Sequence, residues 1–546
     1  MPVIAFARLC ESIAATPKKS EKVRLAADFF RSATPDEAAL AALFLTGMVF
    51  PRREERVLSI GSSLLVKALL KVSGWTSEQF AEVYRRHGDL GGAADDILQA
   101  RTAASEINLQ GIADWFLALS NLRGPEAKLK KLEEILRQLS ALEAKYILKI
   151  ATGDLRIGMK ESLVEEAIAS AYEQPLALVQ RANMFTGDVG EVLRLAAAGN
   201  LHSAQLQLLR PISVMLANPA EVAADLVASF PDGAIAEDKY DGIRAQAHKK
   251  GDRVEFYSRT LGRITEFPEL LQSIGALTGD FILDGEILAW RDGRALPFSV
   301  LQPRLGRTQL DLFVAADVPV IFMAFDILYR NGRSLLEVPL ADRRKELEAL
   351  ASAAQKSSLH LSQNRFCESA EQYEQAFLDA LSRGNEGLLV KAGDSLYVPG
   401  RRGRFWLKLK KPLATLDVVV TAVEYGHGKR HGVLSDYTFA VRDGEKLLNI
   451  GKAFSGLTDV EIRELTSFFL QNTSGQAGGR LQVRPLIVLE VAFDNMQRSQ
   501  RHESGFALRF PRIVRLRPDK TPDEIDTLNT VRAIFDRQNH APIFSK

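Results

Sequence analysis

The chain has 546 residues, of which 46% are hydrophobic and 25% charged, and its formal net charge is +2. This length exceeds what one core supports and predicts roughly two to four domains, while the near-neutral charge means that any positive surface must come from local clusters. The chain has no apolar run long enough to span a bilayer and no signal-peptide pattern at its start, and its two cysteines, Cys10 and Cys367, exclude a disulfide framework or a four-cysteine zinc site.

The first part of the chain, residues 1–205, is predicted to be an all-α domain. Asp36 is predicted to cap a helix that starts near residue 37, and Thr76 to cap one that starts near residue 77. Apolar residues recur at helical spacing in residues 22–30, 64–70 and 129–136.

The second part, residues 206–412, is predicted to be an α+β domain because short β-like runs alternate with turns and helices. The helices are expected at residues 340–354 and 370–382. The strands are expected at residues 233–237, 243–248, 253–257, 281–288, 320–328, 387–390 and 404–409.

The third part, residues 413–546, is predicted to be a small β-barrel such as an OB fold. About five strands and one helix, at 459–470, in roughly 130 residues are typical of that architecture. The clearest strand-like runs are residues 417–423, 437–441, 447–451 and 486–493.

Lys239, in the sequence KYDGIR at 239–244, is the candidate nucleophile. An amine attacks phosphorus only after it loses its proton, and nearby positive charge from Arg244, Lys408 and Lys410 would lower its pKa. The alternative is a strand-end lysine in a hairpin turn, because a short motif counts only in its structural context.

Two carboxylates beside apolar strands, Glu286 and Glu386, are candidate metal ligands. A carboxylate inside the apolar run 281–288 is costly unless it meets a cation or hydrogen-bond donors. Mg²⁺ is commonly held by one or two carboxylates together with phosphates and waters. The alternatives are an Asp-Gly turn between strands at Asp284 and an ordinary strand with charged ends at 386–391.

The strand at 404–409 is strongly basic. Period-two alternation predicts that Arg404, Trp406, Lys408 and Lys410 share one face, and that Phe405, Leu407 and Leu409 face the core. Neighbouring lysines on one face repel one another unless an anion such as a polyphosphate lies between them, although a solvated edge strand is the alternative.

Phe325 could stack on a nucleobase, but a core phenylalanine is the commoner case.

A second basic segment, residues 509–520, has five cations in twelve residues. Arginine side chains match phosphate oxygens bidentately, so this segment is a candidate phosphate contact. The alternative is a basic surface strand that touches nucleic acid nonspecifically.

In this order, the segments resemble the motifs of the ATP-dependent DNA ligases, within the covalent nucleotidyltransferase superfamily. The loop in residues 146–158 is similar to the minor-groove loop of archaeal and eukaryotic replicative-type ligases, in which Gly153 and Gly158 would permit close approach to phosphates and Arg156 would suit a narrow negative groove. Residues 239–244 resemble motif I, 258–262 the next short motif, 283–286 motif III, 325–326 the motif after it, 386–391 motif IV, 406–410 motif V and 509–517 motif VI.

The resemblance implies a three-step reaction. Lys239 would take AMP from ATP, AMP would pass to the 5′-phosphate at a nick in duplex DNA, and the 3′-hydroxyl would displace AMP. The C-terminal barrel would swing between the steps about a predicted hinge at residues 414–417. Glu237 would read the adenine amino group and Phe325 would stack on the base; Glu286 and Arg259 would lie near the ribose and the nick phosphate; Arg244, Arg402, Lys408 and Lys410 would surround the phosphates.

The implied cofactors are ATP and Mg²⁺, the latter near Glu286 and Glu386, and the implied partner is nicked double-stranded DNA. The zinc and cofactor-capturing modules of NAD⁺-dependent ligases are absent from the sequence, which argues for ATP. We expect a monomer in a prokaryotic cytoplasm; whether a replication or repair factor recruits it is left open. An RNA ligase or capping-type nucleotidyltransferase, and a DNA-binding scaffold without catalysis, are the alternative functions.

Overall fold

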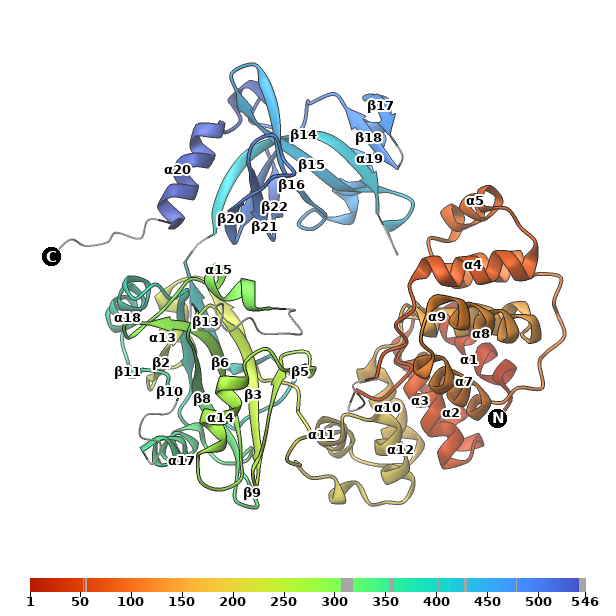
Figure 1. Ribbon diagram of the computed structural model, residues 1–546, viewed down its shortest axis with the longest axis horizontal. Helices are drawn as coiled ribbons and strands as arrows, with labels where there is room; N and C mark the ends of the chain where they lie inside the picture. Colours follow the sequence, from red (N-terminus) through yellow and green to blue (C-terminus); the bar gives the residue numbers. More distant parts are fainter. Residues whose placement is uncertain are drawn as a thin grey trace. The chain divides into compact units, whose positions relative to one another are not determined.

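The computed structural model describes residues 1–52, 54, 56–305, 318–352, 358–400, 402–411, 413–426, 430–477 and 479–539. These residues divide into two compact units, whose helices and strands are labelled in Figure 1. The first comprises Met1–Gly61, Ala104–Lys131 and Lys149–Lys411, and the second comprises Ser62–Ala103, Leu132–Leu148 and Pro412–Lys546. Apart from the basic segment 509–520, every residue predicted to touch the nucleotide belongs to the first unit.

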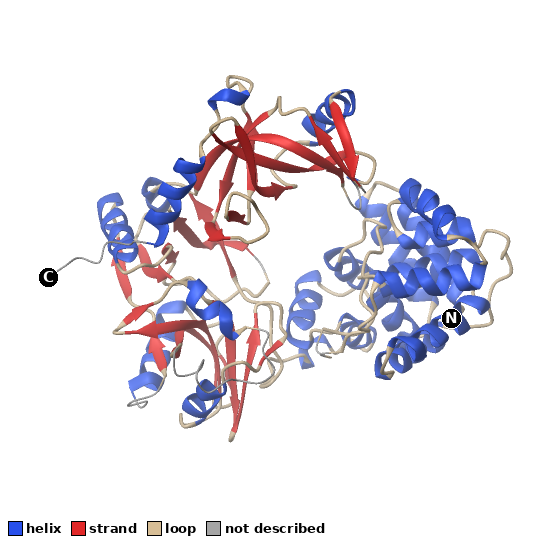
Figure 2. Cartoon of the chain, turned by 45° about the horizontal axis from the view of Figure 1, so that its top comes forward, coloured by secondary structure: helices blue, strands red, loops and turns tan. Residues whose placement is uncertain are grey.

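The N-terminal part of the chain is helical, as predicted (Figure 2). Thr76 caps α5 as expected, because its hydroxyl accepts a hydrogen bond from the Gln79 backbone at 3.3 Å. The prediction for Asp36 is wrong, because Thr34 caps α3 and Asp36 lies inside its first turn. The helices are α1 (Val3–Ala15), α2 (Lys19–Ser32), α3 (Pro35–Leu45), α4 (Ser62–Ser73), α5 (Ser77–His87), α6 (Leu90–Ile97), α7 (Leu109–Asn121), α8 (Pro125–Gln138), α9 (Ala141–Ala151), α10 (Glu161–Ala171), α11 (Leu176–Thr186) and α12 (Val189–Ala197).

The middle part is built on two β-sheets. A five-stranded sheet has the order β1-β13-β12-β2-β11, and an eight-stranded sheet has the path β10-β8-β6-β3-β4-β5 with β7 and β9 beside it. The strands are β1 (Leu216–Ala220), β2 (Ala234–Lys239), β3 (Ile243–Lys250), β4 (Arg253–Ser258), β5 (Arg263–Ile264), β6 (Phe281–Arg291), β7 (Arg294–Ala295), β8 (Val320–Arg330), β9 (Arg333–Ser334), β10 (Leu359–Leu361), β11 (Asn364–Cys367), β12 (Gly387–Lys391) and β13 (Arg402–Lys410). The helices are α13 (Ala223–Ser229), α14 (Pro268–Gly275), α15 (Phe298–Leu301), α17 (Leu340–Ser352) and α18 (Ala370–Ser382).

The two sheets meet across a shared apolar core. Ile282 and Leu328 of the larger sheet pack in one cluster with Trp406 of the smaller sheet. The chain crosses from β2 to β3 through Asp241 and Gly242, where a Cβ atom would collide with the backbone of Ile287. A glycine is therefore required at the crossing, and it brings the end of β2 against β6.

The C-terminal part is rich in strands, as predicted. Its main sheet has seven strands, and β14 pairs with β15, β18 and β19. Its elements are β14 (Ala414–Tyr425), β15 (Leu434–Asp443), β16 (Lys446–Ala453), α19 (Asp459–Gln471), β17 (Thr473–Ala477), β18 (Arg480–Val483), β19 (Val488–Phe493), β20 (Asn495–Arg498), β21 (Phe506–Arg509), β22 (Arg512–Leu516) and α20 (Leu528–Asn539).

The predicted hinge at residues 414–417 lies inside a paired strand. Ala414 is opposite Phe493 and Asp417 is opposite Glu490 in the β14–β19 ladder. A hinge must change its backbone dihedrals freely, which these ladder hydrogen bonds resist. In the part of the chain that the structure describes, none of the helices has the length and apolar character needed to cross a bilayer.

Candidate active site

Lys239 lies at the end of β2 in a cluster with Glu386 and Lys410. Both ammonium groups, Nζ of Lys239 and Nζ of Lys410, are 2.6 Å from Oε2 of Glu386. The register of the smaller sheet brings them together, because Gly387 is opposite Lys239 on one side and opposite Lys410 on the other. The Glu386 backbone N–H also donates to the Lys239 carbonyl at 2.8 Å. The sheet itself therefore fixes one carboxylate between two cations.

The protonation state of Lys239 differs from the sequence prediction. Burial alone would lower its pKa, but the carboxylates of Glu386 and Glu286 outweigh burial and raise the pKa above its ordinary value. Glu286 accepts a hydrogen bond from the Gly242 backbone at 3.0 Å, and burial raises its pKa to about 7 against the opposing effect of Lys239 and Arg244. Without substrate, Lys239 is thus an ion-paired ammonium at neutral pH.

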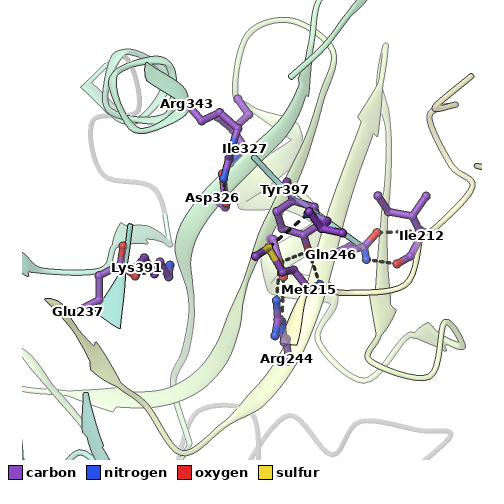
Figure 3. A network of polar contacts seen from close by, with 12 residues as sticks. Ile212, Met215, Glu237, Arg244, Gln246, Asp326, Ile327, Arg343, Lys391 and Tyr397 are labelled. Atoms are coloured by element: carbon purple, nitrogen blue, oxygen red, sulfur yellow. Dashed lines mark hydrogen bonds and ion pairs between the residues drawn. The ribbon is translucent and has the colours of Figure 1, made fainter. Parts of the chain in front are cut away.

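A buried ion pair lies beside this cluster. Glu237, which shares a face of β2 with Lys239, accepts a hydrogen bond from Lys391 Nζ at 2.7 Å (Figure 3). The same ammonium is 4.6 Å from the ring centre of Phe325 and 4.5 Å from that of Trp406. The structure therefore brings the predicted base-reading residues, Glu237 and Phe325, to one ammonium that the sequence analysis did not assign.

Arg244 is engaged away from the phosphate role predicted for it. Its guanidinium forms two hydrogen bonds with Asp284, at 2.7 and 3.2 Å, and lies 5.3 Å from the Phe325 ring centre. Tyr397 donates to the same carboxylate at 2.6 Å and accepts from the Met215 backbone at 3.1 Å (Figure 3). This network links the Met215 backbone, just before β1, to the Arg244 guanidinium beside the Phe325 ring.

A second buried pair supports the strand that carries Phe325. Asp326 follows Phe325 where the register between β6 and β8 shifts, and Arg343 of α17 binds it through two hydrogen bonds of 2.7 and 2.8 Å. Arg343 also donates to the Ser395 carbonyl at 3.0 Å. An aromatic ring on a strand anchored this way has little freedom to shift.

The basic strand β13 matches its predicted pattern except at one residue. Lys408 and Lys410 share a face, and Leu407 and Leu409 are buried on the other. Phe405, predicted to face the core, has 38% of its surface exposed, whereas Trp406 on the lysine face is buried. Trp406 is buried because it packs in the core between the two sheets, which alternation along one strand cannot reveal.

The other predicted phosphate contacts are Arg402, Arg259 and the basic segment 509–520. Arg402 begins β13, but its side chain lies outside the described part of the structure, as does Arg401. Arg259 is exposed in the turn after β4, outside the hydrogen-bonded cluster at Lys239. In the basic segment 509–520, Arg517 and Lys520 are bound to Asp417 at 2.8 and 2.6 Å.

The predicted DNA-contacting loop connects α9 to α10. Gly153, Arg156 and Gly158 all have positive φ angles, of 70°, 52° and 68°. Arg156 is held by Asp154 at 2.6 Å, and Lys22 donates to the Ile157 carbonyl at 2.5 Å. A left-handed conformation at a non-glycine residue is uncommon and indicates a loop whose shape is set by its contacts.

Comparison with known proteins matches the whole length of this architecture. The family model described as the ATP dependent DNA ligase domain matches residues 214–410, the DNA ligase N terminus matches 2–169, and the ATP dependent DNA ligase C terminal region matches 430–520. A probable DNA ligase of Koribacter versatilis is 48% identical over 98% of this chain and 97% of its own length. DNA ligase 2 of Methanosarcina acetivorans is 35% identical over 98% of both chains.

Among solved structures, one titled Pmar-Lig_PreS3 covers 94% of this chain and 99% of its own, with a TM-score of 0.62 and 15% sequence identity, and this likeness concerns the fold. The match over residues 214–410 identifies the two-sheet part of the chain as a nucleotidyltransferase domain. The chain belongs to the ATP-dependent DNA ligase family and is an enzyme of that family.

Proposed function

We propose that Lys239 is the residue that becomes covalently linked to AMP when this ligase reacts with ATP. The observation that carries the proposal is the position of Nζ, 2.6 Å from Glu386 and beside the Glu237–Lys391–Phe325 group at the seam of the two sheets. A bond forms between Nζ and the α-phosphorus, and the bond from that phosphorus to the pyrophosphate oxygen breaks. Since only the neutral amine attacks, the ion pair with Glu386 has to open as substrate phosphates arrive.

In this proposal the adenine base and the phosphates of ATP bind on different sides of Lys239. Glu237 accepts a hydrogen bond from the adenine amino group, and the ring of Phe325 stacks on the base. Arg244 stays on that side, because reaching a phosphate would mean leaving the buried Asp284 carboxylate. The cations assigned to the phosphates are Arg402, Lys408 and Lys410, and Arg259 is assigned with Glu286 to the ribose and the nick phosphate.

Glu286 and Glu386 fit a magnesium ion in chemistry and number. The described residues contain no group of three or more His, Cys, Asp or Glu side chains that could form an all-protein metal site. Mg²⁺ does not need one, because it is usually bound by one or two carboxylates plus phosphates and waters. When bound, the ion would offset negative charge on the α-phosphate and on the departing pyrophosphate.

The later steps would act on nicked duplex DNA. AMP passes from Lys239 to the 5′-phosphate, and attack by the 3′-hydroxyl then forms the phosphodiester and releases AMP. The loop with Gly153, Arg156 and Gly158 is assigned to the minor groove, because its positive φ angles expose backbone for close approach.

The domain boundaries follow the same scheme, with a DNA-binding domain at 1–205, an adenylation domain at 206–412 and an OB-fold domain at 413–546. The pairing of β14 with three other strands supports the OB assignment, because it curls the sheet toward closure. Monomeric action in a prokaryotic cytoplasm completes the proposal.

Radiolabelled ATP tests the proposal directly. The purified protein with Mg²⁺ should gain an acid-labile label, Lys239→Ala should abolish it, and Lys250→Ala, at an exposed lysine on the next strand, should leave it unchanged. Label that persists in Lys239→Ala would overturn the assignment. Sealing of nicked RNA in preference to nicked DNA, or labelling by GTP in preference to ATP, would favour an RNA ligase or capping-type enzyme, and nick binding without label a scaffold.

A further inference from the structure

Asp238 lies between two residues of the site but faces the other side of its strand. Side chains alternate along β2, so Glu237 and Lys239 share one face and Asp238 points to the opposite one. Asp238 is 7% exposed and receives two hydrogen bonds from Arg383, at 2.7 and 2.8 Å, and one from Asn385 Nδ2 at 2.8 Å. Three donors thus converge on a carboxylate that has no place in the reaction.

The donors belong to the turn that delivers Glu386. Helix α18 ends at Ser382 and β12 begins at Gly387, so Arg383 and Asn385 make up half of the four-residue turn between them. The turn is also closed by its own backbone, because Asn385 N–H donates to the Ala380 carbonyl at 3.0 Å. Glu386 follows directly and is the residue that holds Lys239 and Lys410.

We propose that Asp238 is a positioning residue that, through Arg383 and Asn385, sets where the Glu386 carboxylate stands between the two lysines. The inference rests on the proposed role of Lys239 and adds how that site is held in place. The bidentate geometry matters, because a guanidinium fork fixes direction as well as distance. Without it the turn can drift, and a displaced Glu386 no longer fixes the positions of Lys239 and Lys410 at the point of attack.

The proposal predicts an effect on rate with little effect on ATP affinity. The adenine-binding residues Glu237 and Phe325 are held by Lys391 and Arg244, whose hydrogen bonds go to Glu237 and Asp284 and not to Arg383 or Asn385. In single-turnover adenylation, Asp238→Asn and Arg383→Lys should therefore react about tenfold to a hundredfold more slowly, since misplacement by about 1 Å can cost that much. The ATP concentration for half-maximal rate should change less than about twofold.

The chain offers a matched control on the same helix. Asp379 of α18 pairs with Arg365 at 2.9 Å on the surface, one turn from Arg383. Asp379→Asn removes an ion pair of the same type and leaves the hydrogen bonds from Arg383 and Asn385 to Asp238 in place, so its adenylation rate should equal that of the parent protein. Thermal unfolding of all variants checks that they are folded. If Asp238→Asn does not fold, Arg383→Lys, which keeps the positive charge, tests the proposal in its place.

A double variant separates positioning from general stabilisation. If Asp238 acts through Glu386, Asp238→Asn should slow Glu386→Gln by less than about twofold, because the two residues act as one unit. An unchanged rate in Asp238→Asn, or a full additional loss in the Glu386→Gln background, overturns the inference. Those outcomes would leave Lys239-dependent labelling intact, whereas loss of that dependence would refute the proposed function instead.

Discussion

The buried pair of Glu237 and Lys391 allows stability and nucleotide recognition to be separated. Lys391 has no exposed surface and Glu237 is 3% exposed. Glu237→Leu would leave the ammonium buried without a counter-charge, which typically costs 3–5 kcal/mol. The rings of Phe325 and Trp406 stay in contact with it, so we expect the lower end, about 3 kcal/mol.

A second substitution should restore the fold but not the chemistry. In Glu237→Leu/Lys391→Met both charges are replaced by apolar groups of similar volume, and the free energy of unfolding should return to within about 1 kcal/mol of the parent value. The adenine amino group would still lack its acceptor, a loss of about 1.5–3 kcal/mol that raises the KM for ATP roughly tenfold to a hundredfold.

Two assays test this reasoning. Urea denaturation gives the unfolding free energies of the single and double variants, and self-adenylation over a range of ATP concentrations gives KM. The triphosphate of purine riboside, which lacks the amino group, should show no such rise in KM. A double variant as unstable as the single one would refute the ion-pair argument. An equal rise in KM for the analogue would refute the proposal that Glu237 accepts a hydrogen bond from the adenine amino group.

Three further outcomes are expected. Burial lowers the pKa of His248 to about 3 from 6.5, so its contribution to the free energy of unfolding is complete above pH 6.5 and is lost as the pH falls toward 3. The loss should be about 1.4 kcal/mol between pH 7.5 and 5.5. In denaturation experiments His248→Gln should flatten this pH dependence, and equal slopes for the two proteins would contradict the reasoning. Arg156→Ala should weaken binding to nicked duplex DNA and reduce the slope of log affinity against log salt by about one, measured by fluorescence anisotropy; an unchanged slope would remove Arg156 from the interface. Tyr397→Phe leaves Asp284 and the Met215 backbone without the shared hydroxyl and should lower the unfolding free energy by about 1–3 kcal/mol in urea, whereas no change would mean that water replaces it.

Local pattern in the sequence determined much of this protein. Helical spacing predicted α18 at the residues where it occurs, 370–382, and period-two alternation placed Lys408 and Lys410 on one face of β13. The order of short motifs predicted the family that the comparisons show. These features depend on neighbours within a few residues, which is the range over which backbone preference and side-chain period act.

The tertiary structure decided what depends on distant partners. Strand register, not local pattern, brings Glu386 to Lys239 and raises the pKa that the sequence predicted to be lowered. Asp284 binds Arg244 because β3 and β6 are neighbours, and packing between the two sheets buries Trp406. Periodicity within one strand cannot specify which other strand lies beside it, so the chemical state of the site was determined only when the sheets assembled.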